Sequence, residues 1–326
     1  MSDIKRIAVF TSGGDAPGMN AAIRAVVRTA TYHDLHIYGI IRGYQGMYDG
    51  DFIRLETNNV GNILHRGGTI LKTARCDVFR TPEGRKVAYE NLQANDIDAC
   101  IAIGGDGTFT GAQIFSKEFD IPFIGIPGTI DNDIYGTDYT IGFDTAVNTA
   151  IEAVDRIRDT ADSHNRLFFV EVMGRHAGFI ALNTGISSGA AAVMIPETEI
   201  KIEDLIKQLK KGAKRKKLFS LVIVAEGNQN GGATELAKLV KEKFDYYDSK
   251  VAIIGHLQRG GAPSGMDRVL ASRMGFHAVE GLLNGKNNVA VGVVNSKIKF
   301  TPFDDAITKT KTPNKDLIRM SEILAQ

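Results

Sequence analysis

Three short stretches combine glycines with carboxylates, and each directly follows an apolar run. Residues 12–20 have the sequence SGGDAPGMN, residues 104–108 have GGDGT, and residues 127–133 have PGTIDND. Glycines let a backbone turn sharply and approach a ligand, and the free N–H groups at the start of a following helix bind anions. These patterns favour phosphate binding, with carboxylates available to hold Mg²⁺ or to act as a base.

Two of these stretches carry carboxylates that are candidates for a direct chemical role. Asp106 is flanked by glycines, and Mg²⁺ is typically held by one or two carboxylates together with substrate phosphates. Asp131 and Asp133 lie two residues apart, so that one can serve as a general base while the other binds or orients. The structural alternatives are a plain strand-to-helix turn at 12–20 and an N-cap or Asx turn at 131–133.

Three further apolar runs end in charged or glycine-rich segments. These are MGRH at 173–176, EG at 226–227 and GHLQRGG at 255–261. A single His or Arg at such a place is usually structural, but six polar strand ends match the edge where an open α/β sheet binds ligands. We therefore favour a phosphate-handling enzyme. The chain has no GxxxxGK[ST] loop and no protein-kinase signature set, so it must use another arrangement.

The elements that position these segments are predicted from apolar periodicity. Strands are expected at 7–11, 36–41, 99–103, 123–126, 167–172, 191–195, 218–225, 251–254 and 289–294. Most are continuous apolar runs, which is typical of parallel strands buried on both faces. Amphipathic helices are expected at 146–158 and 202–215, with Asn314 capping a last helix. The alternation of strands and helices predicts an α/β doubly wound architecture.

Composition excludes several classes of protein. The chain has 326 residues, which favours two domains, and its 39 Lys+Arg against 38 Asp+Glu argue against a strongly basic nucleic-acid binder. Cys76 and Cys100 lack metal-ligand spacing and are expected to be reduced and structural. No apolar run approaches the roughly 20 residues of a membrane span, and the N-terminus lacks a signal-peptide core, so we expect a cytoplasmic protein. The basic run at 207–217 is interpreted as a solvated helix face, with an anion site as the alternative.

Taken together, the motifs resemble those of the bacterial ATP-dependent 6-phosphofructokinases. The resemblance runs from about residue 5 to residue 283 and depends on TSGGDAPGMNAAIR at 11–24, RGGTILKTAR at 66–75, IGGDGT at 103–108, PGTIDNDI at 127–134, DYTIGFDTA at 138–146, VEVMGRHAG at 170–178 and GHLQRGG at 255–261. The GGDG element alone would also fit lipid or NAD kinases.

The resemblance implies transfer of the ATP γ-phosphoryl group to the C1 hydroxyl of fructose 6-phosphate, with Mg²⁺. It assigns catalysis to Asp131 as the base and to Thr129 and Arg175, and the metal to Asp106. The implied ATP contacts are Gly14, Arg75, Cys76, Gly105, Asp106, Gly107 and Thr108. The implied substrate contacts are Thr129, Ile130, Asp131, Arg166, Met173, Gly174, Arg175, Glu226, Lys250, His256, Leu257, Gln258 and Arg259.

The resemblance also implies an organisation for the whole molecule. We expect two doubly wound, Rossmann-like domains with mostly parallel sheets and helices on both faces. The larger ATP-binding domain would comprise 1–142 and about 258–308, and the smaller sugar-phosphate domain 143–257 and about 309–326. A homotetramer with sites shared between subunits is implied, with no nucleic acid and no membrane as partners.

Departures from the family pattern define further expectations. Pyrophosphate-using relatives tend to carry Asp at the position of Gly107 and Lys at that of Gly128, so the two glycines favour ATP. Lys250 stands where Arg is frequent, and it keeps the charge but loses the bidentate fork. An effector site is implied at Arg24, Arg28, Arg158, Arg215 and Lys217. Thr57, Asn62 and Ala191 replace residues common in that site, which predicts weakened or altered allosteric control.

Two alternatives stay open at this point. One is a pyrophosphate-dependent sugar-phosphate phosphotransferase, or the same fold acting on another sugar phosphate. The other is a catalytically silent nucleotide-binding regulator, which would be expected to lack the base or the metal ligand. Asp106, Asp131 and Arg175 are all present.

Overall fold

The structure is a computed structural model that describes residues 4–161, 166–198, 200–215 and 219–325. The chain divides into two compact units. Unit 1 comprises Met1–Ile130, Ile134–Asp144 and Arg259–Thr310, and unit 2 comprises Asp131–Asp133, Thr145–Gln258 and Lys311–Gln326. Each unit is built on its own sheet.

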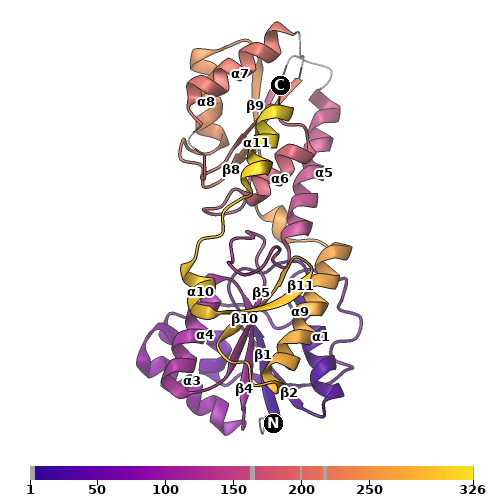
Figure 1. The fold of residues 1–326 in the computed structure, drawn as a ribbon, viewed down its shortest axis with the longest axis vertical. Coiled ribbons are helices and arrows are strands. Elements are labelled where there is room, and N and C mark those ends of the chain that lie inside the picture. The colour runs from indigo at the N-terminus through magenta and orange to yellow at the C-terminus, as the bar shows by residue number, and fades with distance from the viewer. Residues whose placement is uncertain (1–3, 162–165, 199, 216–218, 326) are drawn as a thin grey trace. The chain divides into compact units, whose positions relative to one another are not determined.

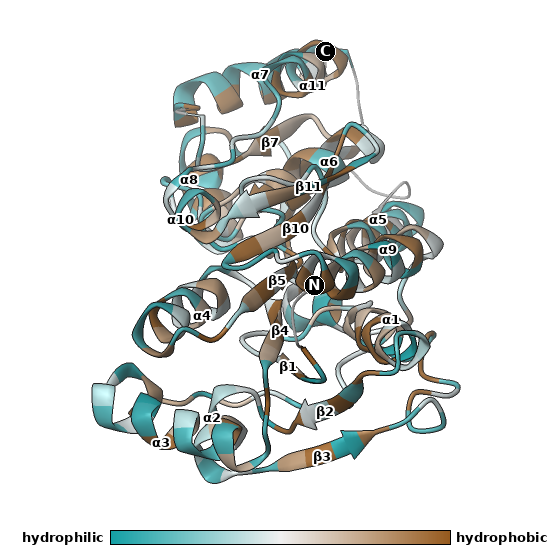
Figure 2. Ribbon diagram, turned by 60° about the horizontal axis from the view of Figure 1, so that its bottom comes forward, coloured by the Kyte–Doolittle hydropathy of each residue, from teal (hydrophilic) through white to brown (hydrophobic). Residues whose placement is uncertain are grey.

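Unit 1 contains a seven-stranded sheet in the order β11-β10-β5-β4-β1-β2-β3. Its strands are β1 (Arg6–Thr11), β2 (His36–Ile40), β3 (Phe52–Leu55), β4 (Ala99–Gly104), β5 (Phe123–Pro127), β10 (Val289–Val294) and β11 (Lys297–Pro302). The five inner strands are parallel, while β3 and β11 pair antiparallel at the two edges. The inner strands β1, β4 and β5 are mainly apolar and buried, as expected for strands covered on both faces (Figure 2).

Helices cover both faces of this sheet (Figure 1). On one face lie α1 (Met19–Tyr32) and α9 (Gly265–Leu283), which pack against each other. On the other lie α2 (Tyr44–Asp49), the 3-10 turn Val78–Arg80, α3 (Pro82–Ala94), α4 (Asp106–Phe119) and α10 (Phe303–Thr308). The core beneath this second group is strongly aromatic: Tyr44 stacks on Phe79, and Phe10, Phe115 and Phe123 meet edge to face.

Unit 2 contains a four-stranded, fully parallel sheet in the order β7-β8-β6-β9. Its strands are β6 (Arg166–Val172), β7 (Ala192–Met194), β8 (Phe219–Ala225) and β9 (Asp248–Ile253). One face is covered by α7 (Ile202–Lys214) and α8 (Ala233–Lys243). The other is covered by α6 (Phe179–Ser187), α11 (Lys315–Leu324) and most of α5 (Phe143–Ala161) (Figure 1).

The predicted α/β doubly wound architecture with mostly parallel sheets is confirmed. The helix capped by Asn314 is also confirmed, because the Asn314 side chain accepts a hydrogen bond from the Asp316 N–H. Two edge strands, β3 and β11, were not predicted. The compact units end at 144, 258 and 310, against predicted limits at 142, 257 and 308, and the assignment of one substrate to each unit stays a prediction.

The run at 251–254 departs from the buried pattern predicted for most of the strands. It lies largely in β9, the edge of its sheet, where Val251 and Ile253 are 41% and 61% exposed. None of the described helices is long and apolar enough to cross a membrane. Cys100 is buried and Cys76 is partly buried, both as free thiols, as expected.

Candidate active site

The two glycine-rich loops of unit 1 meet at the point where the strand order reverses. From β1 the chain adds β2 on one side and later β4 on the other, so the loops after β1 and β4 are neighbours. The Ser12 N–H donates to the Ile103 carbonyl at 3.0 Å, and Thr108 Oγ1 donates to the Ser12 carbonyl at 3.2 Å. A Cβ at Gly104 would lie 2.3 Å from Thr108 Oγ1, so only glycine permits this approach. The predicted ATP loops are therefore packed together.

Asp106 opens helix α4 directly after Gly105. Asp106 and Gly107 are exposed, and Thr108 is buried against the first loop. A carboxylate in the first turn is favoured by the helix dipole and remains accessible to a cation. No group of three or more metal-ligating side chains was found among the described residues. An exposed carboxylate at this position suits a metal whose other ligands come from substrate phosphates and water.

A third segment, residues 66–75, is held at the end of β1. Thr11 Oγ1 hydrogen-bonds Thr69 Oγ1 at 2.9 Å and donates to the Lys72 carbonyl at 2.9 Å. Asn20, buried on α1, accepts from the Ile70 N–H at 2.8 Å and donates to the Arg66 and Gly67 carbonyls. Asn20 lies within the 11–24 motif, but no role was predicted for it from the sequence. Its side chain fixes this segment to the first glycine loop.

The two predicted ATP contacts that follow this segment differ in exposure. Arg75 is exposed, whereas Cys76 is partly buried against the aromatic core of unit 1. Burial raises the pKa of the Cys76 thiol, which keeps it protonated at neutral pH. Cys76 can therefore offer an uncharged contact surface, while Arg75 offers a charge.

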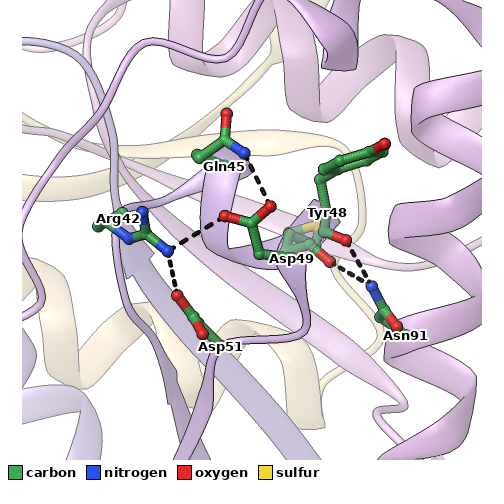
Figure 3. A network of polar contacts seen from close by, with 7 residues as sticks. Arg42, Gln45, Tyr48, Asp49, Asp51 and Asn91 are labelled. Carbon is green, nitrogen blue, oxygen red and sulfur yellow. Dashed lines mark hydrogen bonds and ion pairs between the residues drawn. The ribbon is translucent and has the colours of Figure 1, made fainter.

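Helix α2 contacts the first turn of α4, which carries Asp106. The Tyr44 hydroxyl donates to the Thr108 carbonyl at 2.5 Å, and its ring is buried against Phe79. Figure 3 shows the polar network that holds this short helix. Arg42 pairs with Asp49 and Asp51, Gln45 donates to Asp49 at 2.9 Å, and Asn91 of α3 donates to the carbonyls of Met47 and Tyr48.

Arg259 lies on the first glycine loop. Its Nη1 donates to the Asp15 carbonyl at 3.3 Å, and a Cβ built at Gly14 would come within 2.4 Å of the same nitrogen. The family resemblance implies that Gly14 contacts ATP and that Arg259 contacts the sugar phosphate. The structure brings the two together in unit 1, so that Arg259 adds a positive charge beside the backbone N–H groups of this loop.

The segment after β5 carries Thr129 at the end of unit 1 and Asp131 at the start of unit 2. The Gly128 N–H donates to the Gly104 carbonyl at 3.0 Å, and Thr140 Oγ1 donates to the Thr129 carbonyl at 2.6 Å. Thr129 and Ile130 are buried. Because consecutive Cα atoms are about 3.8 Å apart, covalent geometry keeps the Asp131 backbone within about 8 Å of Thr129.

In unit 2, the structure brings Asp131 and Arg175 together. Asp131 is 2% exposed, and its Oδ2 lies 3.6 Å from Nε of Arg175, whose side chain is 62% exposed. Arg175 has a left-handed φ of 52° and Gly174 a φ of 142°. Glu226 Oε1 accepts from both N–H groups, at 3.2 Å from Gly174 and 2.7 Å from Arg175. Glu226 thus holds the bent loop that aims the guanidinium at the carboxylate.

The second carboxylate of this turn, Asp133, lies in the same environment. Burial raises the pKa of the Asp133 carboxyl, and the charges of Arg175, Lys311 and His176 oppose that rise. The spacing of Asp131 and Asp133 leaves open which of them acts as the base, and the family resemblance assigns Asp131. Asp131 is the one in an ion pair with Arg175.

The segment 255–259 contains both buried and exposed residues. Gln258 is completely buried, where its Oε1 accepts from the Met173 N–H at 2.8 Å and its Nε2 donates to the Ala146 carbonyl at 3.3 Å. The Gln258 side chain therefore positions the Met173 loop, and its amide is used within the fold. His256 and Leu257 are exposed, Leu257 at 71%.

Arg166 and Lys250 share one acidic partner on adjacent strands. Asp248 Oδ2 lies 3.0 Å from Lys250 Nζ and 3.7 Å from Arg166 Nε. Arg166 and Asp248 are directly paired in the register of β6 and β9. Two of the predicted sugar-phosphate contacts thus form a charged cluster on the edge strand β9 and its neighbour β6.

The predicted effector residues are distributed over both units. Arg24 and Arg28 are on α1 in unit 1. In unit 2, Arg158 donates to the Ser188 carbonyl, and Arg215 lines a cavity of about 610 Å³ together with Ala191, Lys207, Lys211 and Lys214. Lys217 lies outside the described residues. The basic run thus combines exposed lysines with the wall of a cavity, and the effector site stays a prediction.

Comparisons with known proteins agree on one family. Residues 6–282 match the family described as Phosphofructokinase. The ATP-dependent 6-phosphofructokinase of Cytophaga hutchinsonii is 54% identical over 98% of this chain and 98% of its own length. ATP-dependent 6-phosphofructokinase 1 of Thermus thermophilus is 53% identical over 99% of this chain and all of its own.

Solved structures support the same conclusion. A phosphofructokinase from Saccharomyces cerevisiae matches with a TM-score of 0.89 at 36% identity, over 93% of this chain and 45% of that chain. This chain therefore spans less than half of that yeast chain. A pyrophosphate-dependent phosphofructokinase from Marinobacter aquaeolei matches with a TM-score of 0.84 at 24% identity, over 98% of this chain and 91% of its own, which concerns the fold alone. The match along most of the chain and the full-length relatives establish that this chain belongs to the phosphofructokinase family.

Proposed function

We propose that this protein transfers the γ-phosphoryl group of ATP to the C1 hydroxyl of fructose 6-phosphate, which gives fructose 1,6-bisphosphate and ADP. Relatives more than 50% identical over their full length carry the name ATP-dependent 6-phosphofructokinase. One observation carries the chemistry: a buried carboxylate, Asp131, paired with a largely exposed arginine, Arg175.

Asp131 acts as the general base of the proposed reaction. It accepts the proton of the C1 hydroxyl as that oxygen attacks the γ-phosphorus, and the bond to the β-phosphate oxygen breaks. Arg175 is oriented by its paired carboxylate and by the loop that Glu226 holds, with more than half of its side chain accessible to a phosphoryl oxygen. Since phosphoryl transfer depends mainly on positioning and charge stabilisation, these two groups and a bound nucleotide are its principal requirements.

ATP would be held by the backbone N–H groups of the two glycine loops in unit 1, with Arg259 beside Gly14 and Thr129 at the end of β5. Mg²⁺ fits this donor set, since Asp106 supplies one exposed carboxylate and phosphate oxygens supply the rest. When bound, the metal contributes positive charge that offsets the charge of the phosphates.

Two glycines support ATP as the donor. No atom lies within 4 Å of a Cβ built at Gly107, so this position leaves open space next to Asp106. At Gly128 a Cβ would lie 3.0 Å from Ile103 and 3.1 Å from Met19, so a long side chain would need repacking. An acidic side chain at 107 would repel a nucleotide phosphate, and glycine avoids this repulsion.

The sugar phosphate is proposed to bind Arg166, Met173, Gly174, Glu226, Lys250 and His256 in an assembly of subunits. Lys250 lies on the edge strand β9, which exposes Val251 and Ile253, and Arg166 starts the neighbouring strand β6. An exposed apolar edge strand is a surface that pairs readily with another chain, which supports sites shared within a homotetramer. A cytoplasmic location and an effector site with altered control belong to the same proposal.

A coupled assay with fructose 6-phosphate, Mg²⁺ and either ATP or pyrophosphate tests the proposal. We expect turnover with ATP that is lost in Asp131→Asn. Faster turnover with pyrophosphate would make the protein a pyrophosphate-dependent phosphotransferase. ATP binding without turnover of fructose 6-phosphate or another sugar phosphate would make it a silent regulator.

A further inference from the structure

The C-terminal segment of unit 2 begins with a lysine that contacts the acidic turn. The turn is defined as Asp131–Asp133, and the segment as Lys311–Gln326. Lys311 Nζ donates to Asn132 Oδ1 at 2.8 Å and lies 5.1 Å from the centre of the Phe179 ring, which is itself buried at the start of α6. Lys311 is therefore fixed between an aromatic face and the residue that joins the two carboxylates.

The centre of the turn, Asn132, has a left-handed backbone conformation. Asn132 is 3% exposed and has a left-handed φ of 56°, a conformation in which non-glycine residues are uncommon. A change in this φ would rotate the residues on either side of it, and one of these is Asp131. The hydrogen bond from Lys311 holds the Asn132 side chain and so restrains this rotation.

The turn also concentrates charge in a buried place. Among the described residues, the titratable and charged groups around it include the carboxylates Asp131 and Asp133 and the cationic or basic side chains Arg175, His176 and Lys311. Burial disfavours the ionised form of Asp133, and the charge of Lys311 is among those that favour it. Removal of the Lys311 charge would make the ionised turn harder to maintain.

We infer that Lys311 is a positioning residue for the phosphoryl-transfer reaction, which fixes the acidic turn through Asn132 and supports its negative charge. The inference rests on the proposed function, because it assigns Asp131 as the base. It places part of the catalytic apparatus in the C-terminal segment, far in sequence from the turn.

Lys311→Met is the first test, with Lys309→Met as the matched control. Lys309 precedes it by two residues and contacts Asp305 at 2.9 Å and the Tyr135 ring, both in unit 1. We expect Lys311→Met to lower kcat by about 10- to 100-fold, since a displacement of about 1 Å of a reacting group can cost that much. The KM for ATP should change little, and Lys309→Met should leave both parameters unchanged.

The pH profile separates positioning from a loss of folding. The acidic limb of the pH profile of kcat reports ionisation of the turn in the substrate-bound enzyme. Loss of a nearby cation should move this limb to higher pH. Lys311→Arg keeps the charge and should restore the limb and most of kcat. A purely structural role would lower the melting temperature and the active fraction without moving the limb.

A double-mutant cycle tests the route through Asn132. Asn132→Gly tolerates the left-handed backbone but removes the acceptor of Lys311. In this background Lys311→Met should cost less than in the wild type. An unshifted limb with wild-type kcat in Lys311→Met would overturn the inference alone. Failure of the wild type to phosphorylate fructose 6-phosphate would instead overturn the proposed function.

Discussion

The two aspartates assigned to the chemistry stand in opposite environments. Asp106 and Asp131 both follow a buried parallel strand of the same sheet, β4 and β5 respectively. Asp106 starts a helix and is exposed, whereas Asp131 is 2% exposed and is paired with Arg175. An exposed carboxylate can exchange water for a cation, while a buried one beside an arginine is held in one orientation. Environment, more than residue type, separates a metal ligand from a base.

The loops that carry these aspartates are also held differently. In unit 1, neutral groups such as Ser12, Thr108 and Asn20 make most of the hydrogen bonds described between the loops, with Arg259 as a charged contact. In unit 2, the charged side chains of Glu226 and Lys311 hold the Arg175 loop and the turn, and the neutral Gln258 holds the Met173 backbone.

The largest effect is expected from Asp131→Asn, which tests whether the buried aspartate is the base. A positioned base contributes about 10²- to 10⁴-fold, so kcat should fall by at least that range. The ATP loops are in unit 1, and the dissociation constant of ATP, measured by calorimetry, should change little. Unchanged turnover would remove Asp131 from the mechanism.

Asp106→Asn tests the exposed member of the pair. Charge stabilisation by a metal is worth several kcal/mol, and each 1.4 kcal/mol or so is tenfold, so kcat should fall by about 10²-fold at fixed Mg²⁺. Raised Mg²⁺ should recover part of the activity, which it should not do for Asp131→Asn. Asp120→Asn, at the other end of α4 in a left-handed conformation that asparagine tolerates, is the control. An unaltered Mg²⁺ requirement in Asp106→Asn would contradict the assignment.

Sequence patterns were sufficient for what depends on local chemistry. The glycine loops, the buried parallel strands and the Asn314 cap each follow from residues close in the chain. The edge position of 251–254 was missed because an apolar run does not reveal which neighbours a strand will have. The Asn20, Tyr44 and Lys311 contacts were missed for a related reason. Their partners are 50, 64 and 179 residues away, and a single sequence contains no signal for such pairs.

Gly107→Asp tests the role of charge beside Asp106, because it adds a second carboxylate there. Nothing lies within 4 Å of the new Cβ, so the fold should tolerate it. Repulsion between the new charge and the nucleotide phosphates should raise the KM for ATP by about fivefold, which corresponds to about 1 kcal/mol at a solvent-exposed site. Gly107→Ser has a similar first atom and no charge, and should behave like the wild type. An equal rise in the KM for ATP in Gly107→Asp and Gly107→Ser would mean that side-chain size, and not charge, is responsible.

The smallest effect expected is a gain in stability from Asp133→Asn. Burial raises the folded-state pKa of Asp133 above its ordinary value of 3.8, so the folded protein binds the proton more tightly than the unfolded chain does. The carboxyl therefore contributes stability below its ordinary pKa and loses it as the pH rises through the raised value.

At pH values above the raised pKa of Asp133, replacement by asparagine should increase the melting temperature by about 2–4 °C for each kcal/mol gained. This gain should shrink as the pH falls towards 3.8. Asp155→Asn, on the exposed face of α5, should shift the melting temperature little at any pH. Calorimetric scans across pH 4–8 measure both variants. A loss of stability in Asp133→Asn at neutral pH would mean that the cations around the turn outweigh the burial of this carboxylate. Asp133 would then not destabilise the fold relative to the exposed Asp155.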